Sequence, residues 1–388
     1  ITKMNPSGRG WITKLLKLIK SGYPEGFDSL EVLYLKLRDV GFLYGSNVAT
    51  LNYLKDSSDY TKEERCKINL LIAFYSVHTN SESPETFETS LIDFYKEINF
   101  YESSLMNDLL GENLESILHK RIHIDNNILT KNFSFFVTNA LLFIDLMAYE
   151  YYLKNKTNTL DYLKHCESSI QTLVVSALNS KEKKTSYDLS LMKLLESSLR
   201  YNDRTSQNYM TIIDSVESKL EAYYYLDLAC MSTWTDLKFE SKQANFLNKL
   251  GKDLKISEPI INECKNAVRL FYKTHENNMA LLSSKNIVHS FYDNSSLIVS
   301  KLISRNSKRL YKELKESKDL VLLLSQSTLR DLNEEEQKQM QEQLLDILKS
   351  IPSLAIFMLP GGAILLPLFI KIIPKLLPSA FDENRIND

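Results

Sequence analysis

The segment NFSFFVTNALLFIDLMAYEYYLK, residues 132–154, decides the expected fold. Its apolar side chains recur at steps of three and four residues, as in Phe136, Ala140, Phe143 and Met147, with polar residues between them. This period places the apolar side chains along one side of an α-helix and is typical of an amphipathic helix.

The region around this segment lacks the residues that interrupt helices. No proline occurs between Pro84 and Pro259, and the only glycines there are Gly111 and Gly251. Because proline ends or kinks a helix, such a stretch favours long helices. No Asn-Gly hairpin signal is present. We therefore predict an all-α protein, with a multi-helix soluble region followed by a proline-broken C-terminal hydrophobic membrane segment.

The composition argues against several classes of protein. The formal net charge is only −2, so we expect no nucleic-acid partner. Only 10 glycines are present, and the motifs GxGxxG, GxxxxGK[ST] and GxSxG are absent. These absences disfavour enzymes built on glycine-rich phosphate loops. No other group of residues forms a recognisable catalytic site, so we expect a protein that is not an enzyme and has no cofactor. The 4 cysteines are scattered without a CxxC pair, which favours reduced thiols over a disulfide or zinc framework.

A long apolar run is the strongest functional signal. Residues 351–370 carry no charge, and a helix of this length, at ~1.5 Å per residue, would match the ~30 Å core of a bilayer. Prolines nevertheless punctuate the run and its continuation; this proline ladder consists of Pro352, Pro360, Pro367, Pro374 and Pro378. In lipid, the carbonyl groups that prolines leave without a donor need other partners. We therefore expect the proline side to face protein, water or another subunit.

Two arrangements of this run remain open. It either spans or deeply enters the bilayer, or it forms a buried, non-spanning hairpin packed in the soluble domain. Gly361 and Gly362, within the ladder, fit a close helix–helix approach or a hinge between half-helices.

The segments that precede the run also have a readable pattern. Residues 301–320 are rich in lysine and arginine, and form either a solvated helix or a face for anionic lipid or an acidic partner. Asn333 and Glu336 then make a capping-box pattern, which predicts the start of a helix. The apolar face of that helix is predicted to consist of Met340, Leu344, Leu345, Ile347 and Leu348.

The proline ladder resembles the membrane-spanning region of the LETM family, the leucine-zipper and EF-hand transmembrane proteins of the mitochondrial inner membrane. The likeness covers roughly residues 325–381. It includes Lys371, just before the fourth proline, and the ending LPSAF at 377–381. Together with the opening MNPSGRGWI, the entire chain resembles the bacterial group of LETM-related biofilm-associated proteins.

This resemblance implies a membrane-associated protein of bacterial envelope or biofilm physiology that acts in cation homeostasis or cation/proton exchange. An ion pathway from one such segment per chain needs several chains, so we expect a homo-oligomer in the lipid bilayer. No export signal is found, and we expect the bulk of the chain on the cytoplasmic side of the bacterial inner membrane. Two departures matter: Ala363 stands where the family carries an acidic residue, and the mitochondrial members continue beyond the position of Asp388 into a ribosome-binding domain and EF-hands. Ribosome binding is therefore not carried over.

Residues 225–275 are similar to the TerB-like helical domains. Asp236 and Glu240 match the two carboxylates of that pattern, whereas Leu237 replaces its turn glycine. The carboxylates would contribute to a Ca²⁺ or Mg²⁺ site in one interpretation. In the other, Asp236 caps a helix and Glu240 favours the positive end of that helix.

Further polar residues have two interpretations each. His119 and His123 are four residues apart with Asp125 close by, which fits a zinc site or ordinary surface histidines. Asp145 and Glu150 lie near an aromatic stripe and are either buried carboxylates or members of salt bridges.

These patterns predict four regions: an N-terminal helical domain (1–200), a TerB-like region (201–285), charged helices leading to the membrane (286–350) and the membrane segment (351–381). The leading hypothesis is the LETM-like membrane protein. One alternative is a membrane-anchored interaction scaffold without transport activity, and the other is an enzyme with an unrecognised metal or carboxylate site.

Overall fold

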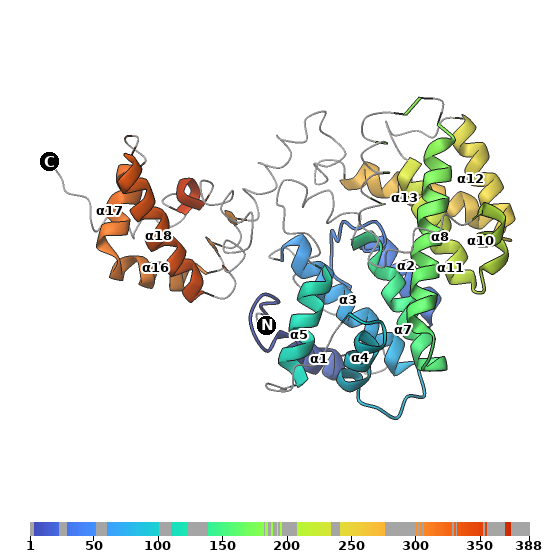
Figure 1. The fold of residues 1–388 in the computed structure, drawn as a ribbon, viewed down its shortest axis with the longest axis horizontal. Helices are drawn as coiled ribbons and strands as arrows, with labels where there is room; N and C mark the ends of the chain where they lie inside the picture. Colours follow the sequence, from blue (N-terminus) through green and yellow to red (C-terminus); the bar gives the residue numbers. More distant parts are fainter. Residues whose placement is uncertain are drawn as a thin grey trace. The chain divides into compact units, whose positions relative to one another are not determined.

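In the computed structural model, every regular element of the described part of the chain is a helix (Figure 1). The described residues are 4–22, 29–51, 60–100, 110–122, 139–181, 183–184, 188, 192, 195, 208–233, 241–275, 299–300, 303–304, 306–327, 330, 332–351, 354 and 369–373. No strand occurs among them, and the prediction of an all-α fold is confirmed for these residues.

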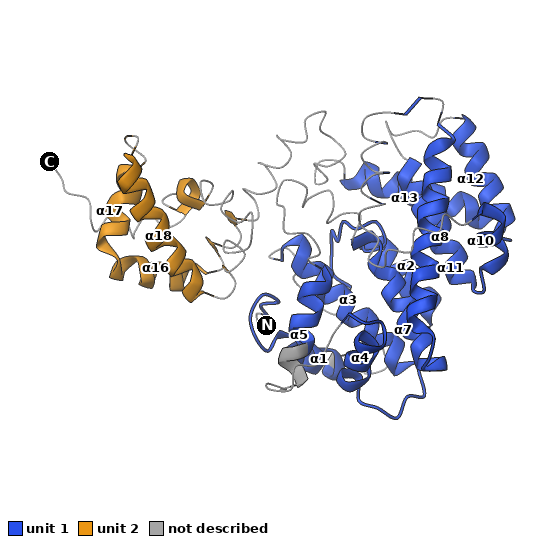
Figure 2. Ribbon diagram, viewed as in Figure 1, with its two compact units in different colours: residues 1–124, 133–279 blue, residues 125–132, 280–388 orange. Residues whose placement is uncertain are grey.

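The chain divides into two compact units (Figure 2). Unit 1 consists of residues 1–124 and 133–279, and unit 2 of residues 125–132 and 280–388. The helices of unit 1 are α1 (Trp11–Gly22), α2 (Leu30–Asp39), α3 (Lys62–Thr79), α4 (Phe87–Glu97), α5 (Leu110–Ile122), α7 (Leu142–Asn155), α8 (Thr159–Asn179), α10 (Tyr209–Ser215), α11 (Lys219–Thr233), α12 (Ser241–Asp253) and α13 (Glu258–His275). Those of unit 2 are α16 (Ser307–Glu316), α17 (Lys318–Gln326) and α18 (Glu334–Ser350).

Unit 1 is built around α7 and α11, two helices that are buried on most of their sides. α8 packs against both α7 and α11. α7 also packs against α3, and α11 also packs against α12 and α13 (Figure 1). The described part of the 132–154 segment is therefore more deeply buried than a single apolar stripe requires. Every residue from Leu142 to Tyr149 is buried, because neighbouring helices cover several faces of α7.

Aromatic side chains fill the centre of the α3, α4 and α7 contact. The rings of Phe74 and Tyr149 lie 5.3 Å apart at 84°, and those of Phe94 and Tyr149 lie 5.3 Å apart at 66°. Edge-to-face pairs of this kind gain about 0.5–1.5 kcal/mol beyond the burial of their area.

A buried ion pair joins α5 to α7. The Arg121 guanidinium donates two hydrogen bonds to the Asp145 carboxylate, at 2.7 and 2.8 Å, and both residues are fully buried. The ring of Phe100 lies 4.7 Å from the guanidinium carbon. Asp145 is thus both buried and in a salt bridge, whereas Glu150 pairs at the surface with Lys154.

α12 and α13 approach so closely that one position between them has to be glycine. A methyl group on Gly251 would lie 2.5 Å from Ile261 side-chain atoms. Glycine is needed here because it has no side chain to keep the two helices apart, and not because the backbone adopts a special conformation.

We expect Asp145→Asn to lower the free energy of unfolding by about 3–5 kcal/mol, because it leaves the buried Arg121 charge without its opposite charge. Urea unfolding measures this change. Glu150→Gln is the matched control, since loss of an exposed pair costs less than about 1 kcal/mol. Equal effects of the two substitutions would contradict the assigned role of the buried pair.

Candidate functional site

Helix α18 begins at a tightly fixed cap. The Asn333 side chain accepts a hydrogen bond from the Glu336 N–H, and the Glu336 carboxylate accepts one from the Asn333 N–H, both at 2.9 Å. The predicted capping box is therefore confirmed. The Arg330 guanidinium donates to both Glu336 oxygens, at 2.7 and 2.8 Å. These bonds, followed by that from the Asn333 N–H, lower the pKa of Glu336 to about 2.

The apolar face of α18 packs with α16 and α17 into one hydrophobic core, which we call the unit 2 core. Of the predicted apolar face, Leu345 is only partly buried, whereas four residues are buried: Met340, Leu344, Ile347 and Leu348. α16 contributes Leu310 and Leu314 to the same core.

Four residues of the predicted membrane segment also belong to the unit 2 core. Ile351, Leu354, Phe369 and Ile373 are at most 1% exposed. Phe369 and Ile373 are four residues apart in a helical segment, so they lie on the same side of it, whereas Lys371 between them is exposed. These residues pack as expected for the buried-hairpin arrangement.

Most of the other predicted site residues lie outside the described part of the chain. They are Pro352, Pro360, Gly361, Gly362, Pro367, Pro374, Pro378, Asp236, Glu240, His123 and Asp125. Among the helices that are described, none has both the length and the apolar character needed to cross a membrane.

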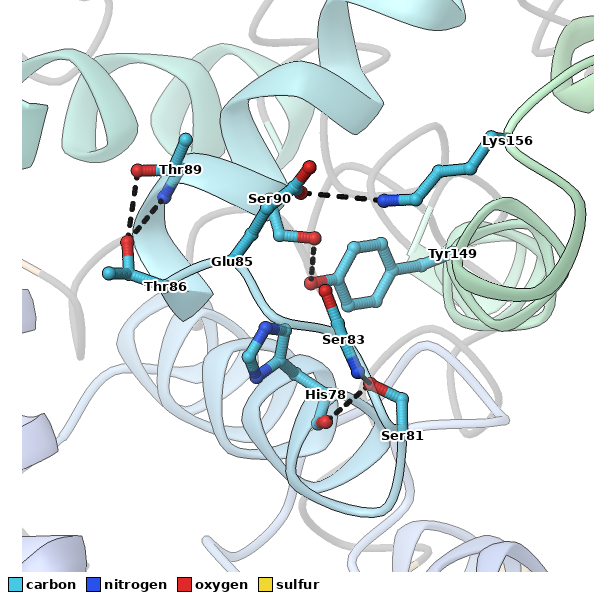
Figure 3. Close-up of polar contacts among 9 residues, drawn as sticks. All are labelled: His78, Ser81, Ser83, Glu85, Thr86, Thr89, Ser90, Tyr149 and Lys156. Carbon is cyan, nitrogen blue, oxygen red and sulfur yellow. Dashed lines mark hydrogen bonds and ion pairs between the residues drawn. The ribbon is translucent and has the colours of Figure 1, made fainter.

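A polar cluster in unit 1 links α4 to the end of α7 (Figure 3). The Tyr149 hydroxyl donates to the Ser90 hydroxyl at 3.1 Å, and the Lys156 ammonium lies 3.4 Å from the Glu85 carboxylate. Burial raises the pKa of Tyr149 and lowers that of His78, which lies beside them. Both groups are therefore held in their neutral forms, and the contacts of Tyr149 with Ser90 and of Lys156 with Glu85 join the end of α7 to the start of α4.

A second buried cluster joins α2, α11 and α13 around Asp227. The Tyr34 hydroxyl donates to the Asp227 carboxylate, and the Arg38 guanidinium lies 3.7 Å from that carboxylate and 2.5 Å from Glu263. Burial raises the pKa of Asp227 to about 6, although Arg38 and Tyr34 act in the opposite direction. Burial also raises the pKa of the neighbouring Cys264 thiol, so the thiol is protonated and a poor nucleophile.

The remaining metal and nucleophile candidates do not assemble into a site. His119 is exposed, and its Nδ1 lies 3.2 Å from the Lys67 ammonium nitrogen. The His165 imidazole contacts the Ser215 hydroxyl at 2.8 Å, whereas burial raises the pKa of Cys166. Among the described residues, no group of three or more His, Cys, Asp or Glu side chains is arranged to hold a metal ion.

Comparison with known proteins assigns the C-terminal part of the chain. Residues 332–388 match the family model described as "LETM1-like, RBD". The match begins at α18 and includes the proline ladder from Pro352 onward, so the resemblance to the LETM family is confirmed for this part. No comparison supports the TerB-like resemblance of residues 225–275. No curated protein and no solved structure matches the chain.

Sequence reasoning found the α18 cap but missed some of the residues around it. Arg330 has no signal in the sequence, because its role depends on the turn that returns it to Glu336. Phe369 and Ile373 have a signal, a spacing of four residues, but this spacing fits a membrane helix as well as a protein core.

We expect Phe369→Ala to destabilise unit 2 by about 3–5 kcal/mol, the usual cost of truncating a buried phenylalanine. Hydrogen exchange of the α18 amides measures this locally, because exchange reports the opening of individual regions. The exposed neighbour provides the control: Lys371→Ala should change protection by less than about 0.5 kcal/mol. Unchanged α18 protection in Phe369→Ala would show that the side chain is not part of the core.

The pH dependence of stability tests the Asp227 cluster. The folded pKa of about 6 lies above the ordinary value of 3.8, so the folded state binds this proton more tightly. As the pH rises from about 3 to 7, the wild type should therefore lose about 3 kcal/mol of stability relative to Asp227→Asn, about 2 kcal/mol of it between pH 4 and 6, and the loss persists at higher pH. Urea unfolding of both proteins across this range measures the difference.

Asp253 supplies a control of opposite sign, because hydrogen bonds from Lys249 and Tyr209 lower its pKa. Relative to Asp253→Asn, the wild type should gain stability as the pH rises. A wild-type minus Asp227→Asn difference that is flat or rises with pH would overturn the assignment.

Proposed function

We propose that this protein is a LETM-like membrane-associated protein in which residues 351–381 enter the bilayer while unit 1 stays at the cytoplasmic surface. The observation that carries the proposal is the match of residues 332–388 to the LETM1-like family model over α18 and the proline ladder. The envelope or biofilm role, which the resemblance implies, is part of the same proposal.

The proposed activity is cation homeostasis by a homo-oligomer. Pro360, Pro367 and Pro374 follow one another at seven-residue steps, so they fall near one side of a helix. That side needs polar partners for its carbonyl groups, and neighbouring subunits or a water-lined path would supply them. Because Ala363 cannot carry a proton, cation/proton exchange would require a titratable group from elsewhere in the assembly.

Membrane entry by this segment means leaving the unit 2 core. Full burial of a large apolar side chain such as Phe369 or Ile373 contributes about 1.5–3 kcal/mol. Each Leu, Ile or Phe near the centre of a membrane helix contributes about 0.3–0.6 kcal/mol. Insertion of several residues of the run is therefore needed to offset the free-energy cost of removing one residue from the unit 2 core.

Alkaline carbonate extraction of membranes tests the proposal. We expect the full chain to remain in the membrane pellet. Ile364→Asp combined with Leu366→Asp should move the protein to the supernatant, because each charge near the bilayer centre costs about 2.5–3.5 kcal/mol. Substitution is preferable to truncation after Ser350, since truncation also removes Ile351, Leu354, Phe369 and Ile373 from the unit 2 core.

Gln339→Asp combined with Gln341→Asp is the matched control. These two positions are exposed on α18 and change the net charge equally, so this variant should stay in the pellet. If the unmodified chain itself is extracted by carbonate, residues 351–381 are not an integral membrane segment and the proposal fails.

A further inference from the structure

A row of lysines lies on the solvent side of α16. Lys308, Lys312 and Lys315 follow one another at steps of four and three residues, and all three are exposed. This spacing places them on one face of the helix. The buried side of the same helix is formed by Leu310 and Leu314. We call Lys308, Lys312 and Lys315 the lysine stripe.

The residues bordering the stripe favour a surface that meets an interface. Tyr311 is partly buried against the unit 2 core, and the Lys315 ammonium lies 6.0 Å from the centre of its ring. A tyrosine with one apolar and one wet side is typical of the boundary between hydrocarbon and water. Of the two acidic residues of α16, Glu316 is four residues after Lys312 and therefore borders the stripe, whereas Glu313 lies further round the helix.

Charge is also segregated within unit 2. The first turn of α18 consists of Glu334, Glu335 and Glu336, whereas α16 has no acidic residue in its first turn and carries the stripe. A merely solvated surface does not require this separation, because mixed charges keep a protein soluble equally well. The arrangement therefore gives unit 2 a basic helix face distinct from its acidic end.

We propose that the lysine stripe binds the anionic headgroups of a lipid bilayer. The choice of a bilayer as the occupant rests on the proposed function and on one structural link: α16 shares its core with Phe369 and Ile373. Headgroup binding by α16 holds unit 2 at the surface into which the apolar run is to be delivered. Anionic headgroups attract basic residues near the surface by about the same amount per residue, largely independent of lipid identity.

The test measures equilibrium binding and the association rate of the full chain with phosphatidylcholine vesicles, with and without phosphatidylglycerol. The stripe variant combines Lys308→Gln, Lys312→Gln and Lys315→Gln, which keeps helix propensity nearly constant. We expect it to bind anionic vesicles on the order of 100-fold more weakly than the wild type. The difference should shrink at high salt, where the charges are screened.

A scattered variant separates the stripe from net charge. Lys252→Gln, Lys273→Gln and Lys338→Gln remove the same charge from exposed positions on three other helices, and binding should change by no more than about twofold. Equal losses in the two variants would overturn the proposal, because net charge alone would then explain binding. Unchanged vesicle binding in the stripe variant would also overturn the proposal. If the stripe variant instead lost only its binding to polyglutamate, the stripe would be assigned to an acidic protein partner.

This outcome is independent of carbonate extraction. A chain that is extracted by carbonate but binds anionic vesicles through the stripe is a peripheral protein, which would refute the proposed function and keep this inference. A chain that resists carbonate and associates with vesicles equally fast with and without the stripe would support the proposed function and refute this inference.

Discussion

Unit 2 depends on one constraint, which is that apolar side chains must be kept from water. In unit 2, helices α16, α17 and α18 enclose Phe369 and Ile373 together with their own leucines. Under the proposed function a bilayer would accept the same side chains, because hydrocarbon, like a protein core, excludes water. The stability of unit 2 and insertion of the apolar run would then oppose each other, and a substitution in α16, α17 or α18 that weakens the core without altering the run would favour insertion.

The fold class could be predicted from the sequence, whereas the identity of the contacts could not. The absence of proline from residues 85–258 suffices for long helices, and Asn333 with Glu336 locates the start of α18, because both signals are local. The pairing of Tyr34 with Asp227 joins residues 193 positions apart, and that of Arg121 with Asp145 depends on how α5 meets α7. The choice between core and bilayer for residues 351–373 is also hidden, because both environments select the same apolar residues.

The buried charges of unit 1 are paired between helices. Asp145 and Asp227 are fully buried and engaged by side chains from other helices, and all four cysteines are buried with none in a disulfide. Buried ion pairs add little net stability, because desolvation offsets their attraction, but they penalise any packing that separates them. We therefore interpret these pairs as fixing which helices of unit 1 meet.

Helix α18 gives unit 2 a mechanical property. It runs for 17 residues without glycine or proline, about 25 Å from the Asn333 cap to Ser350. Such a rod has no hinge with which to absorb a displacement at its far end, where Ile351 leads into the apolar run. Under the proposed function, a displacement of that run would therefore move α18 as a whole and be passed along its length to the cap that Arg330, Asn333 and Glu336 form.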